Sequence, residues 1–263
     1  MAVMAFASTT SLDRPPSHLR ARDTDDRVNP VYEALVCGNC PARQSDLCGE
    51  LKDPELQDLS RYSLRATFRE GETVIWEGDP ATHAGIVTRG CLRMTRTGAD
   101  GRRQILGFLF SGDIVSLPAT SHYTVSLEAL ANGELCRFER SRLEAALHKY
   151  PNLERGYRRT VATALEGAYG LAYSLGRKTA MERVATFLSD LRSGSCPKSP
   201  GGIMHLPMTR TDIADFLGLT VETVSRMFTK LKGAKVIRLP NAQEVEIVDP
   251  ARLASLAESG NET

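Results

Sequence analysis

The sequence of 263 residues predicts an α+β protein, in which an antiparallel β domain, a long helix and a helical C-terminal domain follow one another. Three observations support this order. Short apolar runs separated by turn residues fill the region 63–140, the hydrophobic period becomes helical after Pro151, and residues 209–232 contain two short helices joined at a glycine. A chain of this length is more typical of two domains than of one.

The β domain is predicted by its turns, which recur at nearly regular intervals between residues 63 and 140. Between the turns lie apolar stretches such as 73-TVIW-76 and 104-QILGFLF-110, each long enough for one strand. Many short strands at this spacing are typical of an antiparallel sandwich or barrel. The turns include Gly71-Glu72, Gly78-Asp79-Pro80, Gly98-Ala99-Asp100-Gly101 and Ser111-Gly112-Asp113.

The long helix follows Pro151 and, by its hydrophobic period, extends to about residue 193. Six of its residues recur at spacings of 4, 3, 4, 3 and 4, a heptad-like seam that suits contact between two helices. Small residues at the centre of the seam favour the close approach of a second copy, and the alternative is a helix packed on its own β domain. The seam consists of Tyr157, Val161, Ala164, Ala168, Leu171 and Leu175.

The segment 209-TRTDIADFLGLTVETVSRMFTKLK-232 is the most specific signal in the chain. Thr209 with Asp212 resembles a capping box at the start of one helix, and Thr220 is suited to cap a second. Gly218 between them can adopt the backbone conformation of a tight turn. Two helices joined in this way form a helix-turn-helix, which places its second helix in the major groove of DNA.

The second helix of this motif has two different faces. Glu222, Ser225 and Arg226 share the outer face, in the N-terminal half that reaches base edges when such a helix binds DNA. Arginine can bind guanine with two hydrogen bonds, glutamate can accept one from cytosine, and serine can serve either base. A solvated face is the simpler alternative. The residues expected to face inward are Val221, Val224, Phe228 and Leu231.

Charge is distributed unevenly along the chain. The total of 33 Lys and Arg against 32 Asp and Glu leaves a net charge of +1, which gives no hint of a nucleic-acid partner. From Arg177 to Arg238, however, 11 basic and 5 acidic residues leave a net charge of +6 (11 − 5). Local basic charge favours contact with phosphates. Candidates for phosphate contacts are Thr209, Arg210, Lys230 and Lys232, and Thr220 is a further candidate DNA contact.

These residues, and the order of domains before them, resemble the Crp/Fnr superfamily of bacterial transcription regulators over roughly residues 31–250. The stretch 218-GLTVETVSR-226 is similar to the recognition helix of the Fnr branch, whose base-reading Glu, Ser and Arg correspond to Glu222, Ser225 and Arg226. The resemblance implies a homodimer that binds a palindrome of the type TTGAT-N4-ATCAA. For an activator it also implies contact with RNA polymerase, and the exposed loop 97–103 is a candidate surface, although a solvated hairpin is the simpler interpretation.

The fold that the resemblance implies is an N-terminal double-stranded β-helix (jelly roll), a dimerisation helix and a winged helix-turn-helix, with the wing at about 236–248. We therefore expect five segments. They are a flexible tail (1–30), a Cys-bearing segment with the β-roll sensor domain (31–150), the dimerisation helix and linker (151–193), the winged helix-turn-helix domain (194–250) and a C-terminal tail (251–263).

Three of the six cysteines form the pattern C-x2-C-x7-C at Cys37, Cys40 and Cys48. The N-terminus is no convincing signal peptide and no stretch of 18 apolar residues follows, so we expect a cytoplasmic protein with reduced thiols and no membrane partner. Clustered cysteines there indicate metal binding or reactivity. Four thiolates suit either zinc or an iron–sulfur cluster, and the spacing does not choose between them. Candidates for the fourth ligand are Cys91, Cys136 and Cys196.

The resemblance does choose, because Fnr-type regulators hold a [4Fe-4S] cluster with an N-terminal Cys trio and one Cys of the β domain. The stretch 129-ALANGELCRFERSRL-143 is similar to the family segment with that fourth ligand, which implies the set Cys37, Cys40, Cys48 and Cys136. Without the resemblance, Cys136 reads as a small buried residue, the usual place of a free cysteine. Cys91 and Cys196 are interpreted in that way.

The sequence thus predicts an oxygen-sensing DNA-binding regulator, active at low oxygen as a homodimer and mainly activating anaerobic or microaerobic genes. The alternative is a zinc- or thiol-redox-dependent regulator of the same fold without an iron–sulfur cluster. A cyclic nucleotide is not expected, because residues 111–130 contain Asp113 and no arginine for its phosphate. An enzyme is not expected either, because the chain shows no nucleophile with a supporting His/Asp constellation and no phosphate loop.

Overall fold

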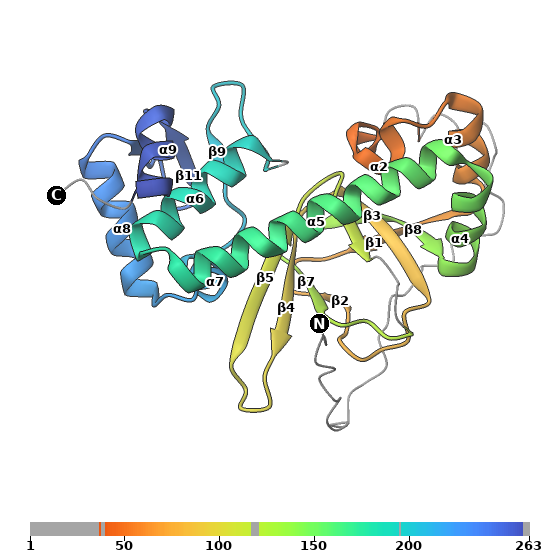
Figure 1. Cartoon of the computed structure of the whole chain (residues 1–263), viewed down its shortest axis with the longest axis horizontal. Helices are drawn as coiled ribbons and strands as arrows, with labels where there is room; N and C mark the ends of the chain where they lie inside the picture. The colour runs from red at the N-terminus through yellow and green to blue at the C-terminus, as the bar shows by residue number, and fades with distance from the viewer. Residues whose placement is uncertain (1–36, 38–39, 117–120, 195, 260–263) are drawn as a thin grey trace.

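The computed structural model describes residue 37 and residues 40–116, 121–194 and 196–259 of the chain, and it confirms the predicted α+β class. Helix α5 (Pro151–Arg177) runs along much of the molecule, with the β domain beneath it and the C-terminal domain at its far end (Figure 1). The predicted tail 1–30 lies outside the described residues. No helix in the described part of the chain has the length and apolar character needed to cross a membrane.

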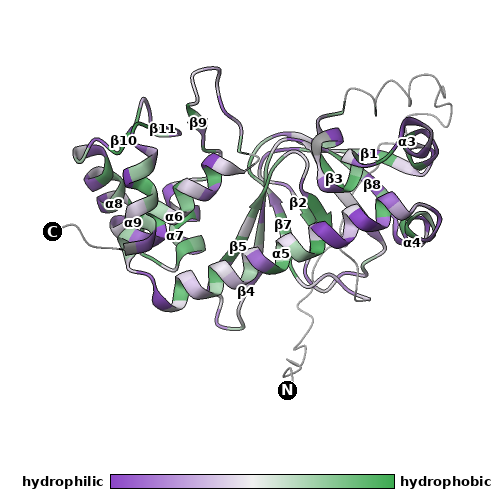
Figure 2. Cartoon of the chain, turned by 45° about the horizontal axis from the view of Figure 1, so that its top comes forward, coloured by the Kyte–Doolittle hydropathy of each residue, from purple (hydrophilic) through white to green (hydrophobic). Residues whose placement is uncertain are grey.

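The β domain is a roll of two antiparallel four-stranded sheets, as the predicted double-stranded β-helix requires. The first sheet has the order β1 (Ser63–Phe68), β8 (Gly133–Glu139), β3 (His83–Arg89), β6 (Ile114–Ser116). The second has the order β2 (Thr73–Ile75), β7 (Ser126–Ala129), β4 (Leu92–Thr97), β5 (Arg103–Leu109). Adjacent residues of β3 serve different cores: Val87 packs inside the roll, whereas Ile86 packs against helices outside it. Hydrophobic colour is concentrated on strands such as β2 and β5 (Figure 2).

Short helices cover the outer face of the first sheet and hold the cysteine segment there. They pack through a second apolar cluster that includes Leu47, Leu59, Phe138 and Leu153, so the start of α5 belongs to the same core. The helices are η1 (Pro41–Gln44), α2 (Asp46–Gly49), α3 (Asp53–Ser60) and α4 (Arg140–Lys149).

Helix α2 crosses α5 at Gly156, where the two backbones nearly touch. A methyl group added at Gly156 would collide with the carbonyl oxygen of Asp46 and lie 3.2 Å from Cα of Leu47. Glycine is therefore required here by space, since its backbone conformation is ordinary helix. Arg159, one turn further along α5, forms ion pairs with Asp46 and Glu50 at the two ends of α2. The segment with Cys48 thus rests directly on the long helix.

The long helix ends earlier than its hydrophobic period predicts. Helix α5 stops at Arg177, Lys178 is extended (φ −80°, ψ 144°), and α6 (Ala180–Ser193) begins at a new N-cap, Thr179. Thr179 and Glu182 form a capping box, which is the local reason for the break. Helix α6 belongs to the C-terminal domain, because Val184 and Leu188 are fully buried in its core. The prediction of one helix from 151 to about 193 is therefore wrong.

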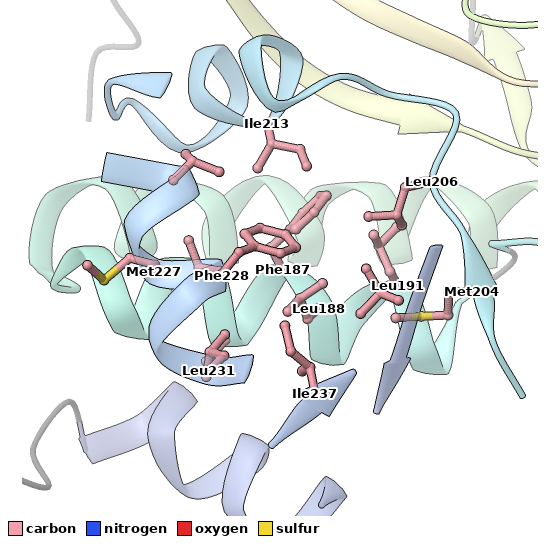
Figure 3. Packing of buried hydrophobic residues seen from close by; sticks show 14 of the residues in the cluster. Phe187, Leu188, Leu191, Met204, Leu206, Ile213, Met227, Phe228, Leu231 and Ile237 are labelled. Carbon is pink, nitrogen blue, oxygen red and sulfur yellow. The ribbon is translucent and has the colours of Figure 1, made fainter. Parts of the chain in front are cut away.

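The C-terminal domain contains the predicted helix-turn-helix and wing, packed around the apolar face of α6. Phe187 and Leu188 of α6 point toward Phe228 and Leu231 of α8 (Figure 3). The strands form a sheet of order β10-β11-β9, whose β10–β11 hairpin is the predicted wing. The remaining elements are β9 (Met204–His205), α7 (Arg210–Leu217), α8 (Val221–Gly233), β10 (Ile237–Arg238) and β11 (Glu244–Ile247).

Residues 251–263 were expected to form a tail, and the structure corrects this expectation for the described part. Helix α9 (Pro250–Ser259) buries Leu253 and Ala257 against the C-terminal core. Asp249 begins the helix: its carbonyl oxygen accepts the first helical bond from Leu253, and its side chain accepts from the amide of Arg252. The apolar residues of this stretch therefore complete the core beside α6.

We expect Gly156→Ala to lower the free energy of unfolding by about 1–3 kcal/mol, because the added methyl group must push α2 away from α5. Urea denaturation monitored by circular dichroism measures this change. Gly176→Ala is the matched control in the same helix, since a methyl group there meets nothing within 4 Å. Equal effects of the two substitutions would contradict the close helix contact.

Candidate nucleic-acid interface and cysteine site

The helix-turn-helix is built as its sequence predicts. Thr209 caps α7 by accepting a hydrogen bond from the amide of Asp212 (3.1 Å), and Thr220 caps α8 by accepting one from the amide of Thr223 (3.2 Å). Gly218 between the helices is left-handed (φ +60°), the region that favours glycine. These local interactions set the angle at which α8 leaves the domain.

Helix α8 has one buried and one exposed face. Glu222, Ser225 and Arg226 are exposed on the outer face, and Nη2 of Arg226 donates a hydrogen bond to the hydroxyl of Thr223 at 3.4 Å. The pKa of Glu222 is lowered by its own backbone amide and by the hydroxyl of Thr220, so this side chain is an anion at neutral pH. Of the inner residues, Val224, Met227, Phe228 and Leu231 are buried and Val221 is half-buried. Met227 was not expected inside.

The other predicted DNA contacts differ in exposure. Thr209, Thr220, Lys230 and Lys232 are exposed. Arg210 is half-buried, and its guanidinium carbon lies 3.6 Å from the centre of the Phe228 ring, a cation–π contact. Burial lowers the pKa of Arg210. Its guanidinium group therefore already contacts the Phe228 ring within the domain.

The seam residues of α5 fall into two groups. Tyr157, Leu171 and Leu175 are half-buried against their own chain, whereas Val161, Ala164 and Ala168 are exposed. Every residue from 161 to 170 is exposed, although this stretch is rich in apolar side chains. The helix is thus packed at both ends and bare in the middle. Large apolar side chains that the heptad pattern omits also lie bare there, namely Leu165 (50% exposed), Tyr169 (64%) and Tyr173 (62%).

Four cysteines from three separate places line one open cavity with a volume of about 30 Å³. Cys37 and Cys40 precede η1, Cys48 lies in α2, and Cys136 lies on the central strand β8, between Arg65 of β1 and Ile86 of β3. The rest of the lining is mostly apolar. It consists of Ala42, Arg43, Leu56, Leu59, Ser60, Ser63, Ile86 and Phe138.

The loop around Cys48 is held by its own side chains. Arg43 donates hydrogen bonds to the carbonyl oxygens of Cys48 (2.8 Å) and Leu51 (2.7 Å), and Ser45 accepts one from the amide of Cys48. Burial, followed by the neighbouring Cys40 and Cys37, raises the pKa of Cys48 to about 12. Burial likewise raises the pKa of Cys136, with Cys48 as the next cause. The pocket therefore disfavours free thiolates.

The cavity brings together the residue types that could hold a metal or a cluster. Within the described ranges, no three His, Cys, Asp or Glu side chains are placed to hold a single metal ion. The four thiols nevertheless face a common apolar space, and a cationic group bound among them would reverse the pKa shifts that burial imposes. Four thiols around a mostly apolar cavity are a ligand set that an iron–sulfur cluster or a zinc ion could use.

Cys91 and Cys196 do not line this cavity. Both are buried in the apolar cluster where the β roll meets the C-terminal domain. Burial raises the pKa of Cys196 to about 11 and also raises the pKa of Cys91. Buried thiols of this kind are unreactive.

A buried carboxylate joins the helix-turn-helix to the β roll, a feature that the sequence analysis missed. Asp212 of α7 is only 2% exposed and forms ion pairs with Arg93 (2.6 Å) and Arg103 (3.5 Å) of the roll. Arg103 also pairs with Asp215 at 2.6 Å. Beside these pairs, the rings of Phe108, Phe187 and Phe216 pack together. The partners lie more than 100 positions apart along the chain, so no local pattern points to them.

Comparisons with known proteins agree with this architecture. Residues 65–150 match a cyclic nucleotide-binding domain, and residues 182–256 match a Crp-like helix-turn-helix domain. The chain is 34% identical over 236 residues to the transcriptional activator protein FnrL of Cereibacter sphaeroides, covering 86% of this chain and 93% of FnrL. It is 35% identical over 222 residues to the nitrogen fixation regulation protein FixK of Bradyrhizobium diazoefficiens, covering 84% and 93% of the two chains.

A solved structure is similar as well. The structure of FixK2 from Bradyrhizobium japonicum superposes with a TM-score of 0.69 at 34% sequence identity, over 75% of this chain and 98% of FixK2. The transcriptional activator protein Anr of Pseudomonas protegens is 32% identical over 231 residues, covering 86% of this chain and 94% of Anr.

We expect Asp212→Asn to lower the free energy of unfolding by about 2 kcal/mol, because the buried partner of two arginines loses its charge while the cap of α7 keeps an acceptor. Urea denaturation of the full chain measures the change. Asp100→Asn is the control, since Asp100 pairs with Arg102 in an exposed turn. An Asp212 variant as stable as the Asp100 variant would show that the ion pairs do not join the two domains.

Proposed function

The chain belongs to the Crp/Fnr family of DNA-binding transcription regulators, and we propose that it is an oxygen-responsive activator whose DNA binding depends on a [4Fe-4S] cluster. The observation that carries the proposal is the convergence of four cysteines on one apolar cavity. Cys37, Cys40, Cys48 and Cys136 would hold the cluster, which when bound supplies an oxygen-sensitive joint between the cysteine segment and the β roll.

The residues around α2 offer a path from this site to the long helix. Asp46 and Glu50 of α2 pair with Arg159 of α5, and Gly156 brings the two backbones together. A change in the position of Cys48 therefore acts on α5 directly. Release of the cysteine segment would loosen the first turns of α5 while leaving Cys136 in its strand.

The bare middle of α5 supports a homodimer formed through this helix. Large contiguous apolar surfaces in water mark interaction sites, and a second copy of α5 can cover this one. Val161, Ala164 and Ala168 lie in the bare stretch, whereas Tyr157 and Leu175 belong to its packed ends. The contact would therefore centre on residues 161–173.

The exposed face of α8 is suited to read the bases of a TTGAT-N4-ATCAA-type palindrome. Arg226 and Ser225 are exposed and loosely held, and Glu222 is charged and able to accept from cytosine. Thr209, Lys230 and Lys232 are exposed candidates for phosphate contacts, and Arg210 would contribute from its half-buried position. Thr220 is a further exposed candidate for contact with DNA. As an activator, the bound dimer would also contact RNA polymerase. No cyclic nucleotide is proposed, because residues 111–130 carry no arginine for its phosphate.

Protein purified without oxygen is expected to contain iron and acid-labile sulfide and no stoichiometric zinc, measured by elemental and sulfide analysis. Cys136→Ala is expected to lose both iron and sulfide, because the fourth ligand is removed. Cys91→Ala is the matched control, a buried cysteine outside the cavity, and should keep them. Stoichiometric zinc in place of iron would support a zinc-dependent regulator, and loss of iron in Cys91→Ala alone would move the fourth ligand.

We expect Arg226→Ala to weaken binding to the palindrome by about 1–3 kcal/mol and to relax the preference at one base pair of each half-site. Fluorescence anisotropy with matched and single-mismatch duplexes measures both effects. Lys232→Ala is the control, since a phosphate contact should weaken binding to every duplex alike and reduce its salt dependence. Equal losses for Arg226→Ala on palindromic and random DNA would contradict a base-reading role.

A further inference from the structure

The first helix of the helix-turn-helix, α7, is held by parts of the chain outside the motif, both along its side and at its C-terminal end. Asp212 in its first turn pairs with Arg93 of the β roll, and Asp215 in its second half pairs with Arg103. At its C-terminal end, the carbonyl oxygen of Leu217 accepts a hydrogen bond from a side chain of α6. The helix-turn-helix is therefore fixed to other parts of the chain, and Figure 1 shows it beside the C-terminal end of α5.

The side chain at the C-terminal end of α7 is Arg183, and it joins three segments. Its Nη1 donates to the carbonyl oxygen of Leu217 (2.9 Å), at the last residue of α7. Its Nη2 donates to the carbonyl oxygen of Leu175 in the last turn of α5 (2.8 Å), and its Nε donates to that of Lys178, the C-cap of α5 (2.9 Å).

These three acceptors share one chemical property. The last carbonyl groups of a helix lack partners within the helix and carry the negative end of its dipole. Two such ends, those of α5 and α7, meet at a single guanidinium group. Its planar fork serves acceptors in fixed directions, which the single ammonium group of a lysine cannot reproduce.

Arg183 is needed neither to cap α6 nor to pair with a carboxylate among the described residues. Helix α6 begins with the capping box of Thr179 and Glu182, so it needs no help from Arg183. No carboxylate within the described residues forms an ion pair with Arg183. Gly218, directly after Leu217, is so close that a methyl group there would lie 3.5 Å from Nη1 and 3.3 Å from a methyl carbon of Leu175. The side chain is thus dedicated to the junction of α5 with the motif.

We propose that Arg183 is a positioning residue for DNA recognition, which locks the turn of the helix-turn-helix onto the end of α5 and so sets the separation of the two recognition helices in the dimer. The break between α5 and α6 is only two residues long, and Arg183 bridges it by contacting both Leu175 and Leu217. The inference rests on the proposed dimer. It does not depend on the proposed cluster ligands or on the proposed operator sequence.

The test uses the full chain purified without oxygen. The wild-type protein first selects its preferred pair of half-sites from a pool of random DNA duplexes. Test duplexes then carry these two half-sites separated by the selected number of base pairs, or by one base pair more or less. The wild type should bind one spacing best. Arg183→Lys keeps the charge but not the fork, and is expected to lose about tenfold in affinity at that spacing and to discriminate less between spacings. Arg192→Lys, an exposed arginine of the same helix, is the matched control.

Light scattering and thermal unfolding of the same samples separate positioning from assembly and stability. A dimer of unchanged mass with a flattened spacing preference supports the proposal. An Arg183→Lys variant that keeps the wild-type preference overturns it, as does an equal loss of affinity at every spacing or the loss of the dimer. A wild type without any spacing preference overturns it too, and a wild type that is not a dimer on DNA refutes the proposed assembly itself.

Discussion

The structure depends on one constraint: helix α5 is packed at its two ends and uncovered in between. Its first turns share a core with α2 and the first sheet of the roll, while its last turn meets the C-terminal domain. The stretch between them presents Leu165, Tyr169 and other apolar groups to water. A partner that covered the middle of α5 would therefore contact a helix whose two ends belong to different parts of the fold. The cysteine site and the helix-turn-helix are consequently linked through the single helix α5.

Charged groups at the boundaries make that linkage specific. Near the N-terminal end of α5, Arg159 pairs with the acidic residues at the ends of α2. At the C-terminal end of α5, Arg183 donates hydrogen bonds to carbonyl oxygens of α5 and α7. Asp212 then fastens the motif to the roll as well. Removing one member of a half-buried pair leaves a charge poorly solvated, so these few contacts define relative positions that apolar packing alone would leave loose. The cysteine cavity has the opposite character, since its walls are mostly apolar.

Much of the architecture was predictable because it depends on short-range patterns. The turn spacing indicated the roll, and the caps and period of residues 209–232 predicted both helices and the buried face that includes Val224 and Phe228. Two errors were also errors of local pattern. The capping box at Thr179 and Glu182 breaks the long helix, and Asp249 before Pro250 begins a further helix, yet the continuous hydrophobic period and the position near the chain end concealed these signals.

By itself the sequence determined the recognition helix and the Cys37–Cys48 pattern, because helical periodicity and ligand spacing are properties of a few neighbouring residues. Spacing alone left the distant cysteine open and the family resemblance implied Cys136; the tertiary structure brings Cys136 to the cavity and buries Cys91 and Cys196 at the domain boundary. It alone also decided that Asp212 meets Arg93 and that Arg183 meets Leu217. Those contacts arise when separately folded units come together, and no local rule of spacing encodes which surfaces will meet.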